Sequence, residues 1–500
     1  MKHNLLTIIA ILFVIFQHPA KADVVPNSLF SDHAVLQRNQ VLPVWGTARD
    51  GEKVSVDFAG QKAETIASGG KWLLKLKPLK AGGPFTMTIR GDNTVTVNDI
   101  LIGEVWVCGG QSNMAYKLNP NIHNGAEEMK NANYPQIRVF NVPYKAARQN
   151  LEDVKSNWLL CSPDLIKNFT AVGYFFARDL YKTLNVPIGL VSSSVGGTPA
   201  EYWLSRTALE SNVLFKHTLG TYKSQVSTYP ARLAKYKAEE PALLEKYNLD
   251  AEAAKKENKP APRKPSPPQN PEETGSASGY YNGMIEPLQP FAIRGVIWYQ
   301  GEANNSSANT YQTLFPTLIA DWRSGWGQGD FPFLFVQIAP FKGMSPEIRE
   351  AQLISWQKTP NTAMVVTTDC GNAEDIHPVL KQPVGARLAL AARALAYQEK
   401  IEYSGPVYES LMVRDSKAIL SFTHQKKLVA KGGELRGFMI AGADKNFVPA
   451  RAELKGDKLV VYSPDVPIPV AVRYGWANTP DVNLYNEHDL PASPFRTDTQ

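Results

Sequence analysis

A serine, a histidine and two carboxylates occur where they could form the catalytic group of a hydrolase. Ser112 follows an apolar run and a double glycine in the segment Val105-Trp-Val-Cys-Gly-Gly-Gln-Ser-Asn-Met. His377 lies much later, in Glu374-Asp-Ile-His-Pro, with two acids before it. A serine hydroxyl becomes a nucleophile when a histidine takes its proton, and a carboxylate can orient that histidine. These residue types indicate acyl transfer through Ser112 and His377.

Two further polar loops could bind the oxyanion of such a reaction. One contains Gly196-Gly197, where a bare backbone N–H group can approach a substrate carbonyl. The other begins at Gln300 and ends at Asn304, again after an apolar run. A glycine turn explains either loop alone, an N-cap role explains Ser112 alone, and a lone histidine is usually structural. Their occurrence after successive apolar runs favours one shared site.

The elements that must position these loops are predicted to form a parallel sheet. Near-continuous apolar runs alternate with helical stretches such as 172–184, 311–322 and 387–397, which is typical of a sheet covered on both faces. The carboxyl ends of parallel strands meet at one edge, where ligands bind. The expected strands are Glu104–Cys108, Ile188–Ser192, Val296–Tyr299, Phe333–Ile338 and Ala363–Thr368.

Short alternating runs separated by Gly, Asp and Asn flank this region and indicate β modules at both ends. We expect a β-sandwich over residues 23–99, the catalytic domain over 100–400 and a β-rich region over 401–500. Residues 229–271 are predicted to be an insertion, in which a charged helical stretch precedes a segment with six prolines. Such a segment could bind a partner, and a solvated surface insertion is the alternative that we favour.

Residues 1–22 have the features of a signal peptide. Lys2 precedes an apolar run from Leu5 to Phe16, and Ala20-Lys-Ala22 offers small residues for cleavage. The run is shorter than the ~20 residues of a spanning helix, so we expect export to the periplasm or beyond, without a membrane span after cleavage. Removing its two lysines lowers the net charge from +6 to +4, which gives no reason to expect nucleic-acid binding.

Other chemistries lack their sequence motifs. The three cysteines, Cys108, Cys161 and Cys370, are too few for a disulfide framework and form no CxxC pair. The histidines are scattered without an HExxH motif, so no metal site and no cofactor are expected. GxxxxGK[ST] and GxSxG are also absent, which leaves a serine presented by a different turn.

Four blocks in this sequence together resemble the SGNH/GDSL hydrolase superfamily, and within it the sialate O-acetylesterase-like carbohydrate esterases. They are Gly-Gln-Ser-Asn-Met, Gly-Gly-Thr-Pro, Trp-Tyr-Gln-Gly-Glu-x-Asn and Asp-Ile-His-Pro, in the family's order. The resemblance covers about residues 101–397 and implies a flavodoxin-like α/β/α fold with a three-layer parallel sheet.

The activity implied by the resemblance is hydrolysis of O-acetyl esters on a sugar or glycan, with sialic acids as the first expectation. Acetylated xylan or another polysaccharide is the alternative substrate. A non-catalytic glycan-binding protein is a third hypothesis, which the intact Ser112 and His377 disfavour. The oligomeric state is not predicted.

The resemblance also implies roles for the site residues. Ser112 would attack the ester carbonyl, and His377 would act as the base. The backbone N–H groups of Ser112 and Gly197 would hold the oxyanion, together with the side chain of Gln300 or Asn304.

The acid that completes the catalytic group has two candidates. The superfamily often has an acid three residues before the histidine, which is Glu374 here, whereas the Asp-Ile-His pattern favours Asp375. We expect Asp375, with Glu374 or a Ser–His dyad as alternatives. Supporting roles are expected for Gln111, Asn113, Glu302 and Glu374.

Overall fold

The central sheet contains eleven strands, of which six neighbours run parallel. The computed structural model describes residues 23–498, so the expected signal peptide lies outside the described residues. Antiparallel strand β10 (Trp158–Cys161) extends the sheet beside β9. In spatial order the parallel strands are β9 (Tyr134–Asn141), β11 (Ile188–Ser194), β8 (Thr94–Gly110), β12 (Gly295–Tyr299), β13 (Phe333–Val336) and β14 (Thr362–Val365).

Five of these six parallel strands coincide with the predicted apolar runs, and β9 was not predicted. Arg138 interrupts the apolar residues of β9. Its guanidinium is buried and donates to both carboxylate oxygens of Asp99, at 2.9 and 3.0 Å. The ion pair with Asp99 compensates the buried charge of Arg138. Because a charged residue lies in the middle of β9, the strand does not appear as an apolar run in the sequence. The α/β class itself is confirmed.

Helices cover strands whose residues are almost all buried. Helix α3 (Ala171–Leu184) packs against α8 (Gln382–Leu395), and α6 (Ala308–Trp326) packs against α7 (Pro346–Lys358). The cap of α3 is Thr170, whose Oγ1 accepts from the Gly173 N–H at 3.4 Å. Shorter helical segments are α1 (Ser112–Ala115), α2 (Gly125–Asn131), α4 (Arg206–Glu210), η1 (Ile166–Asn168), η2 (Ala200–Trp203), η3 (Val213–Phe215), η4 (Tyr281–Ile285), η5 (Glu286–Leu288) and η6 (Glu302–Ser307).

Strand β8 joins the N-terminal β module to the central sheet. Its first half pairs with β7 (Gly82–Arg90) and β2 (Val35–Gln37), and its second half pairs with β11 and β12. The expected domain boundary between residues 99 and 100 therefore falls inside one continuous strand. The other strands of the module are β1 (Val25–Pro26), β3 (Leu42–Thr47), β4 (Lys53–Phe58), β5 (Gln61–Ile66) and β6 (Lys71–Leu76).

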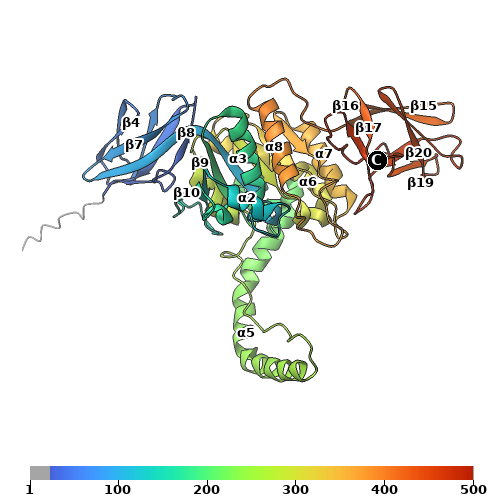
Figure 1. The fold of residues 1–500 in the computed structure, drawn as a ribbon. Coiled ribbons are helices and arrows are strands. Elements are labelled where there is room, and N and C mark those ends of the chain that lie inside the picture. Colours follow the sequence, from blue (N-terminus) through green and yellow to red (C-terminus); the bar gives the residue numbers. More distant parts are fainter. Residues whose placement is uncertain (1–22, 499–500) are drawn as a thin grey trace, which may run out of the picture.

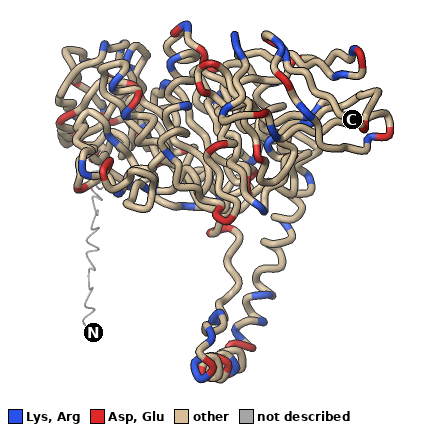
Figure 2. Tube along the Cα trace, turned by 45° about the vertical axis from the view of Figure 1, so that its right-hand side comes forward, with Lys and Arg blue, Asp and Glu red and all other residues tan. Residues whose placement is uncertain are grey.

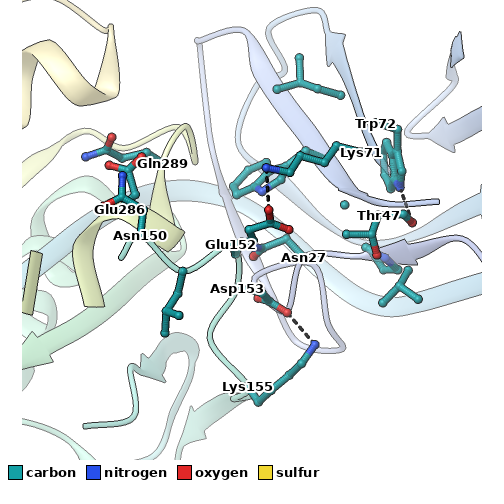
Figure 3. Close-up of a pocket in the computed structure, with 16 residues that line it drawn as sticks. Asn27, Thr47, Lys71, Trp72, Asn150, Glu152, Asp153, Lys155, Glu286 and Gln289 are labelled. Atoms are coloured by element: carbon teal, nitrogen blue, oxygen red, sulfur yellow. Dashed lines mark hydrogen bonds and ion pairs between the residues drawn. The ribbon is translucent and has the colours of Figure 1, made fainter. Parts of the chain in front are cut away.

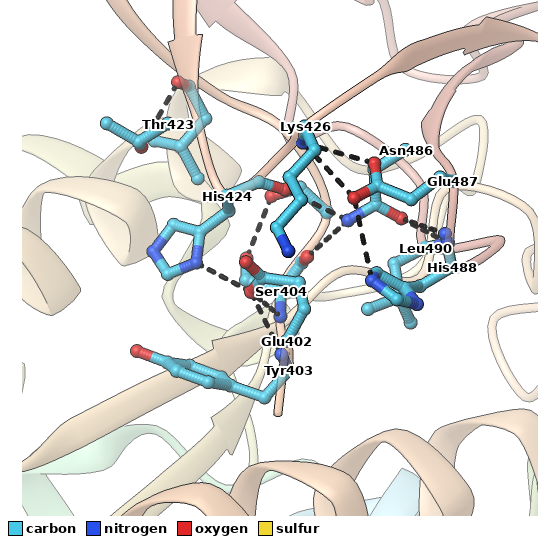
Figure 4. A network of polar contacts seen from close by, with 12 residues as sticks. Glu402, Tyr403, Ser404, Thr423, His424, Lys426, Asn486, Glu487, His488 and Leu490 are labelled. Carbon is cyan, nitrogen blue, oxygen red and sulfur yellow. Dashed lines mark hydrogen bonds and ion pairs between the residues drawn. The ribbon is translucent and has the colours of Figure 1, made fainter. Parts of the chain in front are cut away.

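Antiparallel sheets also form the C-terminal end of the molecule. Polar contacts connect these sheets to residues 402–404, which precede them in the chain (Figure 4). His424 Nδ1 lies 2.8 Å from Glu402 Oε1, and Asn486 Nδ2 donates to the carbonyl oxygens of Ser404 and His424. The His424 ring also packs against Trp356 of α7, at 5.6 Å between centroids. The strands are β15 (Val407–Arg414), β16 (Lys417–Thr423), β17 (Leu428–Ala430), β18 (Phe438–Ala441), β19 (Val448–Pro449), β20 (Arg451–Lys455), β21 (Lys458–Tyr462), β22 (Ala471–Tyr474), β23 (Leu484–Asn486) and β24 (Phe495–Arg496).

A long helical arm projects from the central domain (Figure 1). Helix α5 (Lys216–Lys256) forms it and begins before the expected start at residue 229. Residues 259–270 return without helix or strand, as expected for a proline-rich segment. Figure 2 shows both signs of charge along this arm. Over residues 23–498, no helix has the length and apolar character needed to cross a bilayer.

Candidate active site

The strand order brings three of the predicted loops together. Strand β8 lies between β11 and β12, and its last residue, Gly110, pairs with Ser194 of β11 and Tyr299 of β12. All three strands therefore end at the same level of the sheet. The later strands of the chain lie on both sides of β8, with β9 and β11 on one side and β12 to β14 on the other. This edge is therefore the switch point where open α/β sheets bind ligands.

The turn that presents Ser112 requires glycine at its start. Gly110 has φ of +134°, and a Cβ atom added there would lie 2.2 Å from the carbonyl oxygen of Tyr299. The Gln111 N–H then donates to the same oxygen at 2.9 Å, and α1 begins at Ser112. Gln111, not Ser112, occupies the N-cap position, so the N-cap alternative for Ser112 is not supported. The half-exposed Ser112 hydroxyl makes no side-chain hydrogen bond within residues 23–498.

The glycine loop after β11 lies against this serine. A Cβ atom added to Gly196 would lie 3.5 Å from Cβ of Ser112. Gly197 has φ of +70°, a left-handed conformation that favours glycine. In the described part of the chain, the backbone N–H groups of Ser112 and Gly197 donate to no other protein group. Among the described residues, the two loops that meet here therefore carry two N–H groups without a partner, one at Ser112 itself and one at Gly197, next to the glycine that lies against Ser112.

Gln300 and Asn304 are buried, and their amides bind neighbouring loops. Gln300 Nε2 donates to the Thr198 carbonyl oxygen at 3.2 Å and to Asn304 Oδ1 at 2.7 Å, which uses both of its hydrogens. Asn304 Nδ2 donates to Glu201 Oε2 at 2.9 Å. These bonds fix the glycine loop after β11 to the loop after β12.

Gln111 joins the serine turn to the loop after β12, where Gln111 Oε1 accepts from the N–H groups of Gly301 and Ala303 at 3.4 and 3.2 Å. Asn113 binds that loop through Glu302, as Nδ2 donates to Oε1 at 2.7 Å. Both contacts are consistent with the supporting roles expected for these residues.

The loop that carries His377 follows β14 and reaches across to α1. Asn113 Nδ2 donates to the backbone carbonyl of Ile376 at 3.0 Å, and the rings of Tyr116 and His377 stack at 6.0 Å between centroids. The structure thus brings the histidine loop to the helix that begins at Ser112. Burial lowers the pKa of His377 below its ordinary value, the charge of Lys381 lowers it further, and Asp375 raises it.

The two candidate acids point in different directions. Asp375 Oδ1 accepts from the backbone N–H of His377 at 2.8 Å and lies 3.9 Å from ring Nδ1. Glu374 instead pairs with Lys342 at the surface, where its side chain is 74% exposed. Of the two carboxylates, only Asp375 faces the imidazole.

Other chemistry finds no support in the described residues. Residues 23–498 contain no group of three His, Cys, Asp or Glu side chains that could hold a metal ion. The three cysteines are buried and unpaired, and burial raises the pKa of Cys161 and of Cys370 to about 12. None of them is a candidate thiolate at neutral pH.

A cavity of about 600 Å³ lies between the N-terminal β module and the loop around residues 150–155 (Figure 3). Its polar lining includes the ion pair between Lys71 and Glu152, at 2.7 Å. None of the predicted site residues lines this cavity. The edge of the sheet at Ser112, not this cavity, is the candidate active site.

Two residues near the site were not singled out from the sequence. Tyr116 follows Ser112 by one helical turn, a spacing that could have placed it beside the serine. Lys381 follows His377 by four residues, but a lysine in a sequence is normally interpreted as a solvent-exposed residue.

Known proteins of similar sequence and structure are carbohydrate esterases. A family model described as "Carbohydrate esterase, sialic acid-specific acetylesterase" matches residues 102–237 and 273–393. The sialate O-acetylesterases of Mus musculus and Homo sapiens are 32% and 31% identical to this chain over 94% of its length, and 93% and 91% of theirs. A solved carbohydrate acetylesterase from Xanthomonas citri is 37% identical, with a TM-score of 0.80 over 95% of this chain and 100% of that one. The residues between the two matched segments, 238–272, belong to the distal arm and its return.

Proposed function

The chain belongs to the sialic acid-specific acetylesterase family of carbohydrate esterases, and on this premise we propose that it removes acetyl groups from O-acetylated sugars with Ser112 as nucleophile. The observation that carries the proposal is the register of β11, β8 and β12 at Gly110. It gathers the serine and two free N–H groups at one edge of the sheet. Asn113 and Tyr116 contact the loop that carries His377 and so connect it to the helix of Ser112.

The reaction proceeds through an acetyl-enzyme. Ser112 Oγ attacks the acetyl carbonyl carbon while the His377 imidazole takes its proton, and the carbonyl electron pair moves onto oxygen. Collapse of this intermediate breaks the bond to the sugar oxygen, which receives the proton from His377. His377 then takes a proton from water, the resulting hydroxide attacks the acetyl group, and acetate leaves as Ser112 regains its proton.

The oxyanion is held by the backbone N–H groups of Ser112 and Gly197. Neither donates elsewhere in the described chain. Gln300 and Asn304 position these donors and do not supply a further one. The two amide hydrogens of Gln300 bind Thr198 and Asn304, and those of Asn304 bind Glu201 and Ser307. Loss of one such backbone donor typically costs ~100- to 1000-fold in rate.

Asp375 orients the histidine in this proposal. Its Oδ1 is 3.9 Å from Nδ1 of His377, beyond hydrogen-bond length, and catalytic hydrogen bonds often shorten only when substrate binds. The hydrogen bond from the backbone N–H of His377 to Asp375 Oδ1 already holds the carboxylate next to this residue. The Asp375 side chain is 54% exposed, which leaves it room to rotate towards the ring.

The fold proposed for the catalytic domain is the flavodoxin-like α/β/α arrangement of SGNH hydrolases. Fully buried parallel strands and the helix pairs α3–α8 and α6–α7 support it. Export is part of the same proposal, with residues 1–22 as the signal peptide. The enzyme then meets its glycan substrate in the periplasm or outside the cell.

O-acetylated sialic acids are the proposed substrate, by similarity to the mammalian sialate O-acetylesterases. Acetylated neutral polysaccharides such as xylan are the second candidate. The similar Xanthomonas citri protein, at 37% identity, is described as a carbohydrate acetylesterase without a named sugar, which supports acetylated polysaccharides as second candidate substrates.

Acetate release from a panel of O-acetylated sialic acids and acetylated xylan tests the assignment. The proposal expects turnover of the sialic acids with the higher kcat/KM. Turnover of xylan alone would overturn the sialic acid assignment, and absence of acetate release from every ester, including p-nitrophenyl acetate, would overturn the activity.

A further inference from the structure

A buried lysine lies among the loops of the candidate site. Lys381 immediately precedes α8, and no part of it is exposed. Its ammonium lies 5.3 Å from the ring centroid of Tyr116 and 5.7 Å from that of Tyr299. Lysine is rarely buried without compensation for its charge. The two aromatic faces supply part of that compensation, and the proposed reaction gives this lysine no role.

The carboxamide of Asn113 connects Lys381 to a buried acid. Lys381 Nζ donates to Asn113 Oδ1, and Asn113 Nδ2 donates to Glu302 Oε1 at 2.7 Å. The other oxygen, Glu302 Oε2, has no hydrogen-bond partner in the described part of the chain. The ammonium of Lys381 can only donate, so it requires the amide oxygen of Asn113. The carboxylate of Glu302 accepts, so it requires the amide nitrogen. The remaining Nδ2 hydrogen is thereby directed to the carbonyl of Ile376.

We propose that Lys381 is a positioning residue for the esterase reaction: through Asn113 it holds the His377 loop against the helix of Ser112. The inference rests on the proposed function, because the position of this loop matters to the reaction only if His377 acts on Ser112.

The groups that face Lys381 come from several elements. Tyr116 follows α1, Tyr299 ends β12, Glu302 follows β12, Cys370 follows β14, and Asp375 and His377 belong to the loop before Lys381. His377 itself lies against Tyr116 and Asp375. The charge of Asp375 raises the pKa of His377, and the charge of Lys381 lowers it.

The sign of the electrostatic effect follows from these neighbours. Burial lowers the pKa of Lys381 to about 8, so the ammonium is still mainly protonated at neutral pH. A positive charge beside an imidazole disfavours the imidazolium, and this adds to burial in lowering the pKa of His377. Removing the charge must raise the pKa of His377, so that the base becomes protonated at a higher pH.

The test compares Lys381→Met, which loses charge and hydrogen bond, with Lys381→Gln, which loses the charge but retains a donor for Asn113. The matched control is Lys342→Met, because Lys342 contacts the same loop through Glu374 but is 62% exposed, where solvent screens its charge. The first measurement is the pKa of His377, followed by NMR of protein with isotope-labelled histidine and assigned with His377→Gln. The second measurement is the pH profile of kcat/KM.

The proposal expects the pKa of His377 and the acidic limb of kcat/KM to rise together by roughly 0.5–1 pH unit in both Lys381 variants. Lys381→Gln should keep a higher kcat than Lys381→Met, because it can still hold Asn113. The Lys342→Met control should match the wild type. A kcat of folded Lys381→Met equal to that of the Lys342→Met control would overturn the proposal.

The two proposals fail in different ways. A wild type without esterase activity would overturn the proposed function. An active wild type whose kcat is matched by folded Lys381→Met would overturn the role of Lys381 alone.

Discussion

Asn113 donates a hydrogen bond from Nδ2 to the backbone carbonyl of Ile376 at 3.0 Å, which joins the helix of the proposed nucleophile to the loop of the proposed base. Ser112 and His377 are far apart in the sequence, and this buried amide connects the residues directly beside them. The geometry of the site therefore depends on a residue that takes no part in bond making.

Replacing Asn113 by alanine should lower both stability and activity. The change leaves a buried carboxylate at Glu302 and a buried ammonium at Lys381 without their shared partner, at a cost of about 2–4 kcal/mol. Thermal unfolding and kcat of Asn113→Ala, compared with the exposed control Asn121→Ala, measure the effect. Equal midpoints for the two variants would contradict the structural role of this amide.

Asp375→Asn should lower kcat by something on the order of 10²- to 10⁴-fold, as expected when a histidine loses its orienting carboxylate. The larger figure comes from a serine protease. Glu374→Gln is the matched control and should change kcat by less than about threefold, because Glu374 pairs with Lys342 at the surface. The reverse order of effects would assign the role to Glu374. Mild losses in both, with His377→Ala inactive, would indicate a Ser–His dyad.

The pH profile of kcat/KM should keep its plateau to below pH ~6.5, the ordinary pKa of histidine. Burial and Lys381 lower the pKa of His377, so the neutral base persists to lower pH and activity falls only as pH drops through that lowered value. Measurements of kcat/KM between pH 4.5 and 8, in a single buffer series of constant ionic strength, would show where activity falls on the acidic side. A midpoint above pH ~7 is the result that this account does not allow.

EDTA should leave the rate of acetate release unchanged. The proposed reaction uses only side chains and backbone N–H groups, and within residues 23–498 no cluster of metal-ligating side chains is found. Dialysis against EDTA followed by assay with and without added zinc provides the measurement. A loss of activity restored by zinc would show that the site has been misidentified.

The sequence predicted the parts of the site that depend on local structure. The double glycine before Ser112 and the glycine loop at Gly197 are required by left-handed or closely packed backbone, and both follow strands that are recognisable as apolar runs. The edge where they meet follows from the order of a parallel sheet. Ser112, Gly197 and the His377 loop were therefore expected at one edge, where the structure has them.

Features set by tertiary partners could not be predicted in this way. Strand β9 was missed because Arg138 breaks its apolar pattern and is compensated by Asp99, which is distant in the sequence. The sequence favoured Asp375 but left Glu374 as an alternative, because the ion pair between Glu374 and Lys342 joins residues that are distant in the sequence. Lys381 was overlooked because its burial depends on Asn113 and on two tyrosine rings from other elements.

The account is tested most directly by trapping the acetyl group on the enzyme. Rapidly quenched wild-type protein, mixed with p-nitrophenyl acetate or an O-acetylated sialic acid, is digested and analysed by mass spectrometry, with Ser112→Ala as the control. The account predicts one acetyl group on the peptide that contains Ser112, a folded Ser112→Ala protein with an unchanged thermal midpoint, and no acetate release by that variant. Acetate release by Ser112→Ala within tenfold of the wild type, or an acetyl group on a different residue, would contradict it.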